Sequence, residues 1–129
     1  MKKRSVFISH SARDADWARS FARALKERGI DVWFDEFDVR PGESLRDALE
    51  AGLRKSDVLV ALVDEESPSR PNLFFELGAA IGMGKRVVPI VPKDLDPKVL
   101  PLDVRLRRHL IRNTPEQTAQ ELSNSLQAA

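Results

Sequence analysis

The sequence predicts an α/β protein in which helices cover a parallel sheet, and three observations support this class. Short runs rich in β-branched residues alternate with longer segments of helical periodicity, which is typical of successive strand–helix–strand units. The middle runs are apolar throughout, as expected of strands covered on both faces. The length of 129 residues suits a single core with two helical layers. We therefore expect one domain over residues 1–129.

Five strands are expected from these runs. They are Ser5–Ser9, Asp31–Phe34, Asp57–Val63, Arg86–Val91 and His109–Ile111. If the strand order is flavodoxin-like, 2-1-3-4-5, ligands would bind between the first and third strands, beyond their carboxyl ends. The loops His10–Arg13 and Asp64–Pro71 would then form the walls of that crevice.

Four helices are expected between the strands. The first carries an apolar stripe with Trp17 and Phe21 and stops at Gly29. The second begins at Ser44, an N-cap residue with Asp47 as its approximate capping-box partner. The other two run from about Asn72 to Met83 and from Pro115 to Leu126, with Pro115 suited to a first turn.

The composition excludes several classes of function. The 21 Lys and Arg nearly balance the 20 Asp and Glu, and a net charge of +1 provides no field to gather nucleic acid or an anionic membrane. There is no Cys, which removes disulfides, thiol nucleophiles and thiolate metal sites. The apolar stretch Val6–Ile8 is too short for an export signal. We therefore expect a cytoplasmic protein without nucleic-acid or membrane partners.

Glu76 is the most informative candidate for chemistry. The helix from Asn72 to Met83 has hardly any polar face, and Glu76 is its one ionisable side chain. An unpaired carboxylate among apolar neighbours needs a partner, a raised pKa or a function. The alternative is that Glu76 faces solvent and complements the helix dipole. The loop that leads into this helix would border the crevice, which favours a functional role.

Other patterns are less specific. Ser9-His10-Ser11 contains a nucleophile and a base, but adjacent strand residues point apart and no nucleophile elbow is present. The acidic group around Asp35 lacks the ligand spacing of a calcium loop, so we expect no metal site. Trp33 could line the crevice or pack beneath a helix. The arginines Arg13, Arg40 and Arg70 lie in loops and could contact a diphosphate.

Together these motifs resemble a bacterial-type TIR (Toll/interleukin-1 receptor) domain over roughly residues 4 to 92. The resemblance rests on the segments Val6–Ser11 with Asp14 and Trp17, Gly29–Asp35, Pro41–Leu45, Ser56–Val58 and Phe75–Leu77. It implies a flavodoxin-like fold with sheet order 2-1-3-4-5. For the enzymatic branch it also implies cleavage of the nicotinamide–ribose bond of NAD, by hydrolysis or cyclisation, with NAD as substrate and no cofactor.

The resemblance also assigns roles to residues. Glu76 matches the catalytic glutamate of the family, and Ser9, His10, Ser11, Arg13 and Asp14 would line the substrate site, with Trp33, Asp35 and Arg40 as further candidates. The loop Asp35–Ser44 would gate the site and join protomers head to tail. Asn72 stands where the family usually has an aromatic residue, four residues before the glutamate. Phe74 or Phe75 could substitute for that aromatic residue, although both suit core packing.

The chemistry is compatible with a single carboxylate. The leaving group of NAD is a pyridinium that departs as a neutral molecule, so no general acid is needed, unlike in an ordinary glycoside. Glu76 would bind the ribose hydroxyls and stabilise an oxocarbenium-like transition state. The resemblance implies that this NAD cleavage serves bacterial immune or stress signalling. Two rival functions stay open: a non-catalytic TIR–TIR interaction and signalling module, and a nucleoside deoxyribosyltransferase, which the segment Phe75–Lys85 also resembles.

Overall fold

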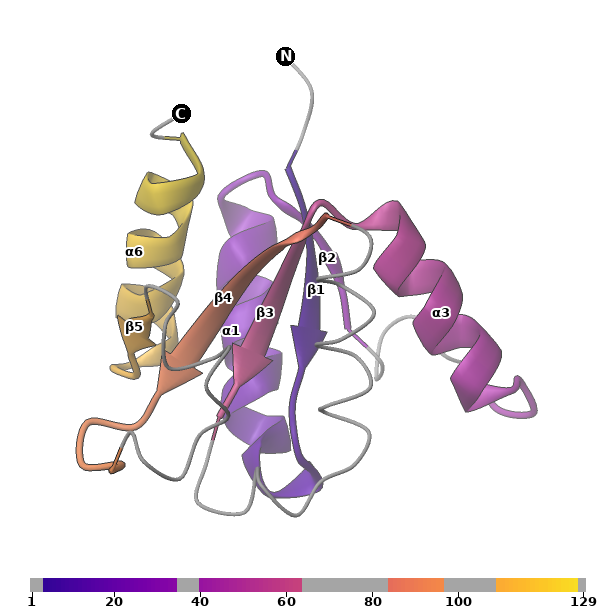
Figure 1. Ribbon diagram of the computed structural model, residues 1–129, viewed down its shortest axis with the longest axis horizontal. Coiled ribbons are helices and arrows are strands. Elements are labelled where there is room, and N and C mark those ends of the chain that lie inside the picture. The colour runs from indigo at the N-terminus through magenta and orange to yellow at the C-terminus, as the bar shows by residue number, and fades with distance from the viewer. Residues whose placement is uncertain (1–3, 35–39, 64–83, 97–108, 128–129) are drawn as a thin grey trace.

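A computed structural model describes residues 4–34, 40–63, 84–96 and 109–127. Within these residues the five expected strands form one sheet, and every neighbouring pair is parallel (Figure 1). Their order is β2-β1-β3-β4-β5, so the predicted flavodoxin-like topology is confirmed. The strands are β1 (Ser5–Ser9), β2 (Asp31–Trp33), β3 (Val58–Leu62), β4 (Arg86–Val91) and β5 (Leu110–Ile111).

The expected strand ends differ from the observed ends by one residue in β2, β3 and β5. β2 ends at Trp33 because its pairing with β1 ends where Trp33 lies beside Phe7. Phe34 was expected to continue this strand, and instead it follows the strand as a fully buried side chain. β5 pairs only with Ile90 and Val91 of β4, so it is the shortest strand of the sheet.

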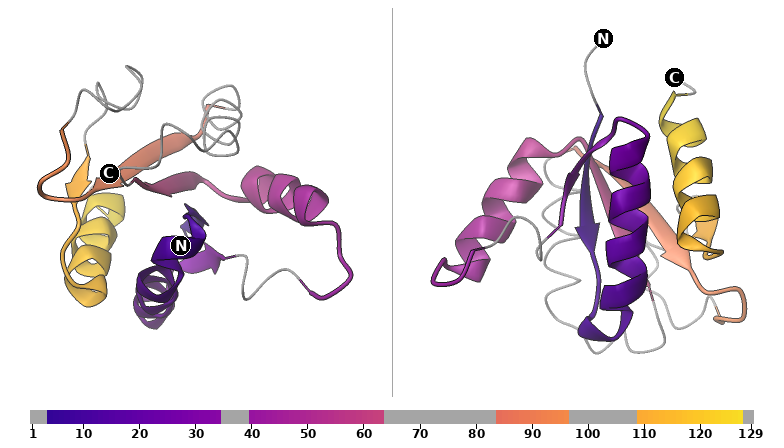
Figure 2. Two further views of the ribbon diagram at one scale, coloured as in Figure 1. Left: turned by 90° about the horizontal axis from the view of Figure 1, so that it is seen from below. Right: turned by 180° about the vertical axis from the view of Figure 1, so that it is seen from behind.

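Helices cover both faces of the sheet. α1 (Ala15–Glu27) follows a short 3-10 turn, η1 (Ala12–Asp14), and packs with α6 (Pro115–Gln127) on one face. α3 (Leu45–Lys55) lies on the opposite face (Figure 2). The expected helix from Asn72 to Met83 lies outside the described residues. No helix in the described part of the chain is long and apolar enough to cross a membrane.

The described residues form two hydrophobic clusters, one on each face of the sheet. Because neighbouring residues of a strand point to opposite faces, Val6 and Ile8 pack toward α1 and α6, whereas Phe7 packs toward α3. The first cluster also contains Phe21 and Leu122, and the second contains Leu53. The continuous apolar runs of the sequence thus reflect strands that are buried on both sides.

Local signals set the ends of the helices. Gly29 has φ +79°, and the N–H of Ile30 donates to the carbonyl of Leu25 at 3.2 Å, which is a helix stop of the Schellman type. Ser44 Oγ accepts from the N–H of Asp47 at 3.3 Å, so the predicted N-cap of α3 is confirmed. Thr114 Oγ1 accepts from the N–H of Gln117 at 3.2 Å and caps α6 directly before Pro115.

Candidate active site

The topology places a candidate site at the carboxyl ends of β1 and β3. In the order β2-β1-β3-β4-β5, the chain continues from β1 to β2 on one side and from β3 to β4 on the other. The connections therefore diverge between β1 and β3, which is where open parallel sheets bind their ligands. Ser9 is the last residue of β1 and is 6% exposed. His10, Ser11 and η1 follow it at this edge of the sheet.

His10 has a defined orientation in this segment. Its ring lies against the ring of Phe34, with centroids 5.0 Å apart. Its Nδ1 lies 2.7 Å from the carbonyl oxygen of Ser11. A carbonyl can only accept a hydrogen bond, so Nδ1 must carry the proton, and in the neutral ring Nε2 is the acceptor nitrogen. The hydrogen bond thus fixes which ring nitrogen of His10 is the donor and which is the acceptor.

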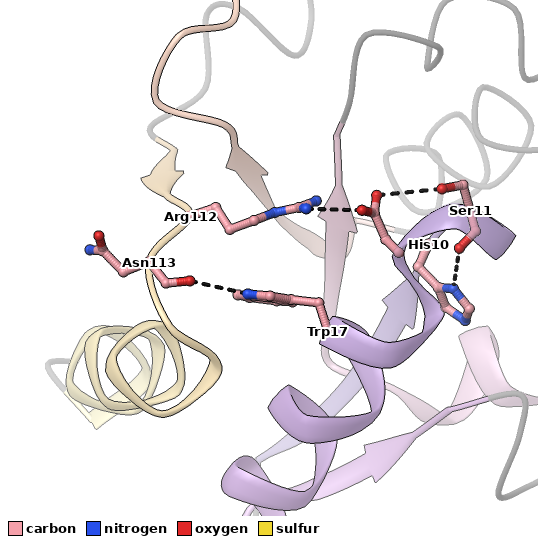
Figure 3. Close-up of polar contacts among 6 residues, drawn as sticks. His10, Ser11, Trp17, Arg112 and Asn113 are labelled. Carbon is pink, nitrogen blue, oxygen red and sulfur yellow. Dashed lines mark hydrogen bonds and ion pairs between the residues drawn. The ribbon is translucent and has the colours of Figure 1, made fainter.

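Asp14 connects this segment to Arg112, the residue that directly follows β5. Its Oδ2 accepts from Ser11 Oγ at 3.4 Å, and its Oδ1 accepts from Arg112 Nη1 at 2.9 Å (Figure 3). The side chains of Arg112 and Asp14 are only 18% and 12% exposed. Both carboxylate oxygens of Asp14 therefore contact other parts of the protein.

Trp17 completes the contact between the start of α1 and the segment after β5. The guanidinium of Arg112 lies 5.1 Å from the centroid of the Trp17 ring, a cation–π geometry. Trp17 Nε1 donates to the carbonyl oxygen of Asn113 at 3.1 Å, and the N–H of Asn113 donates to buried Thr118 at 3.0 Å. We call Asp14, Trp17, Arg112 and Asn113 the Arg112 clamp (Figure 3).

Two nitrogens of the Arg112 guanidinium group are not satisfied within the clamp. Its Nε and Nη2 are buried and have no hydrogen-bond partner among the described residues. A buried donor without an acceptor costs about 1–3 kcal/mol, and burying an ion pair also carries a desolvation penalty. Because of these costs the net contribution of the clamp to stability is small, so stabilising the fold does not by itself explain the clamp.

Sequence reasoning missed Arg112. The residue lies 98 positions from Asp14 and follows a strand of two residues, so no periodicity links the pair. One signal was available: a cation directly after a predicted strand of a parallel sheet lies at the same edge as the residues that follow the other strands.

Arg13 and Arg40 are both exposed. Arg13 lies in η1, directly before Asp14. Arg40 begins a tight turn in which the N–H of Glu43 donates to the Arg40 carbonyl at 3.0 Å, and the N–H of Arg40 donates to Glu43 Oε1 at 3.1 Å. Gly42 has φ +87°, as a type II turn after Pro41 requires. Contact of either arginine with a diphosphate stays a prediction.

Trp33 has a packing role. Its ring stacks on that of Phe7, with centroids 4.7 Å apart and an angle of 5° between the planes. Gly52 of α3 approaches it so closely that a Cβ there would lie 2.5 Å from Trp33 Nε1. These contacts show the packing beneath a helix that was one of its two expected roles. The contact with substrate stays a prediction.

The remaining site predictions lie outside the described residues. They concern Glu76, Asn72, Asp35 and Arg70. In the residues that the structure does describe, no group of three His, Asp or Glu side chains is arranged to hold a metal ion.

The fold and the site position define a flavodoxin-like α/β protein with its candidate site at the β1–β3 switch point. The family model described as the TIR domain matches residues 6–126. The chain therefore belongs to the TIR domain family, as the sequence motifs indicated.

Two relatives illustrate this membership. The 2' cyclic ADP-D-ribose synthase AbTIR of Acinetobacter baumannii (strain 1295743) is 29% identical over 126 residues, covering 94% of this chain and 47% of that protein. The NAD(+) hydrolase PdTIR of Paracoccus denitrificans (strain Pd 1222) is 30% identical over 131 residues, covering 95% of this chain and 43% of that protein. The chain thus spans less than half the length of these two relatives.

Solved structures share the fold at low sequence identity. The TIR domain of the Toll-related receptor TRR-2 from Hydra magnipapillata superposes with a TM-score of 0.74 at 15% identity, covering 95% of this chain and 94% of that one. The CMP N-glycosidase BcmB of Clostridium botulinum gives a TM-score of 0.67 at 17% identity, covering 95% and 99%. These likenesses concern the fold alone.

Proposed function

We propose that this TIR domain cleaves the nicotinamide–ribose bond of NAD and releases nicotinamide with ADP-ribose or a cyclic form of it. The observation that carries the proposal is the match of nearly the whole chain to relatives named as an NAD(+) hydrolase and a 2' cyclic ADP-D-ribose synthase. The ordered segment from Ser9 to Asp14 at the switch point supports the same conclusion. A role in bacterial immune or stress signalling belongs to this proposal.

Glu76 is the proposed catalytic residue. Nicotinamide leaves as a neutral molecule, so one carboxylate that stabilises positive charge on the ribose is sufficient for the bond cleavage. Water, or a hydroxyl of the substrate itself, then forms the new bond to the anomeric carbon and releases its proton to solvent. The first gives the linear product and the second gives the cyclic one.

The segment from Ser9 to Asp14 is the proposed wall of the substrate site. The hydrogen bond of His10 Nδ1 leaves Nε2 as the acceptor in the neutral ring, which suits a ribose hydroxyl or the nicotinamide amide as donor. Exposed Arg13 and Arg40 suit the diphosphate, because guanidinium groups bind phosphate oxygens in pairs. Trp33, Asp35 and Asn72 complete the proposed set.

Self-association is part of the proposed function. The loop Asp35–Ser44 would join protomers, and its described part contains the exposed, hydrogen-bonded turn from Arg40 to Glu43. We place the protein in the cytoplasm, where NAD is available, and propose no cofactor besides this substrate, no nucleic-acid partner and no membrane partner.

The test is chromatography of nicotinamide after incubation of concentrated protein with NAD. We expect release by the wild type and a loss of about 100-fold or more in Glu76→Gln, in line with the removal of a group that stabilises transition-state charge. Glu50→Gln, at an exposed position of α3, is the matched control and should retain full activity.

Two outcomes would overturn the proposal. Association that survives Glu76→Gln, with no consumption of NAD in any assembled state, would indicate a pure interaction module. Base exchange on deoxynucleosides with NAD untouched would indicate a nucleoside transferase.

A further inference from the structure

The Arg112 clamp links two parts of the chain that are distant in sequence and meet beside the candidate site. Arg112 follows β5, and Asp14 ends η1 directly before α1. The contact runs from Arg112 through Asp14 to Ser11 Oγ. The carbonyl of Ser11 in turn accepts the hydrogen bond from His10. The clamp therefore ends on the segment that forms the proposed wall of the substrate site.

The orientation of Arg112 is fixed from two further directions. The Trp17 ring lies 5.1 Å from its guanidinium carbon, and the Asn113 carbonyl, on the next residue, accepts from Trp17 Nε1. A guanidinium that is held by a ring and a carboxylate at once has little freedom to turn. Because contacts other than Asp14 hold Arg112 in place, Arg112 can determine the position of the Asp14 carboxylate.

We propose that Arg112 is a positioning residue for NAD binding: through Asp14 and Ser11 it holds the His10–Asp14 segment in the conformation that accepts the substrate. The proposal rests on the proposed function. Nε and Nη2 of Arg112 are buried without a partner among the described residues, and this supports the proposal, because buried donors in a contact that serves stability alone are normally satisfied.

The first test measures kcat and KM for NAD in Arg112→Met. A segment displaced by about 1 Å costs up to about 100-fold in catalytic efficiency, and we expect most of the loss as a raised KM. A mere loss of folded protein would lower kcat and leave KM unchanged, because the remaining folded molecules bind normally. An unchanged KM in Arg112→Met would therefore overturn the proposal.

Arg28→Met is the matched control. Arg28 also bridges α1 to α6, through Gln120 Oε1 at 3.3 Å, but at the C-terminal end of α1, away from the His10–Asp14 segment. This variant should keep the wild-type KM within about twofold, as expected of a substitution with no contact to the site. An equal rise of KM in both variants would show that the effect is a general one on the fold, which would overturn the proposal.

A double-mutant cycle distinguishes positioning from direct contact with substrate. Asp14→Ala removes both carboxylate oxygens, so it can hold neither Arg112 nor Ser11. If Arg112 acts through Asp14, the double variant raises KM no more than the larger single effect. Arg112→Lys, which keeps a cation for Asp14, should recover part of the loss. If the rise of KM in the double variant equals the product of the two single rises, the two residues act independently and the proposal is contradicted.

NMR of His10 provides a readout that does not depend on NAD turnover. Long-range proton–nitrogen correlation shows which ring nitrogen carries the proton, and only His10 and His109 contribute signals. We expect the Nδ1–H signal of His10 to weaken or shift in Arg112→Met and to stay in place in Arg28→Met. An unmoved His10 signal in Arg112→Met would overturn the positioning role. Absence of NAD cleavage by the wild type would instead refute the proposed function.

Discussion

Both ends of α1 are joined to the C-terminal part of the chain by an arginine, and the two arginines have different surroundings. At the N-terminal end, Arg112 is paired with Asp14, their side chains are 18% and 12% exposed, and two buried nitrogens of Arg112 have no acceptor among the described residues. At the C-terminal end, Arg28 is only half-buried and donates to the Ala24 carbonyl at 2.9 Å and to Gln120 at 3.3 Å. One contact holds a buried charge, and the other uses neutral acceptors near solvent.

This difference separates a contact that serves a site from one that serves the fold. A buried ion pair gains little net stability over apolar side chains of similar size, because desolvation offsets its attraction. Hydrogen bonds to neutral acceptors near the surface carry no such penalty. The costly arrangement occurs at the carboxyl edge of the sheet, beside His10 and Ser11, where the candidate site lies.

The largest expected effect on stability comes from Asp14→Ala. Removing one partner of a buried pair leaves an uncompensated charge, which costs about 3–5 kcal/mol. Urea unfolding measures this change. The control is Asp16→Ala, which breaks the pair of Asp16 with Arg19, whose side chains are 96% and 34% exposed, and exposed pairs contribute about 0–1 kcal/mol. Similar losses in both variants would show that burial does not distinguish the two pairs.

A smaller effect is expected for Trp17→Phe. Phenylalanine keeps a ring beneath Arg112 but lacks the N–H that donates to the Asn113 carbonyl at 3.1 Å. The loss of one hydrogen bond lowers the free energy of unfolding by about 1 kcal/mol. Thermal unfolding checks it, and an unchanged midpoint would mean that this bond does not hold the N-terminal end of α1.

The double variant Asp14→Leu with Arg112→Met removes both charges together. Because neither charge of this pair is left without the other, the free energy of unfolding should stay within about 1 kcal/mol of the wild type. Urea unfolding beside Asp14→Ala tests this directly. A double variant as unstable as Asp14→Ala would show that the clamp serves the fold after all.

Arg28→Met should change stability least. Its hydrogen bond to Gln120 is exposed and its bond to the Ala24 carbonyl is part-buried, and both acceptors are neutral. Substitutions that leave no charge unpaired near the surface stay within about 0.5 kcal/mol of the wild type. The same unfolding experiment measures it. A loss comparable to that of Asp14→Ala would remove the contrast between the two ends of α1.

The fold could be predicted from the sequence because its signals are local. Apolar runs gave the strands, and Gly29 and Ser44 gave helix ends that the structure confirms. The contacts of the site were less accessible. The sequence was compatible with two roles for Trp33, and its packing is seen only in the structure, from its stack on Phe7 and the approach of Gly52. Arg112 went unrecognised because its contact with Asp14 depends on how β5 and α1 are placed in space.

The most direct test of the site's location maps NAD onto the chain by NMR. Glu76→Gln is expected to bind NAD without cleaving it, so amide signals can be followed as NAD is added. We predict shifts in Ser9–Asp14 and at Arg112 and Asn113, with residues 28–31 and Gln120 unaffected. Shifts confined to the Arg28 end of α1, or none at saturating NAD, would contradict a site at the carboxyl edge of β1 and β3.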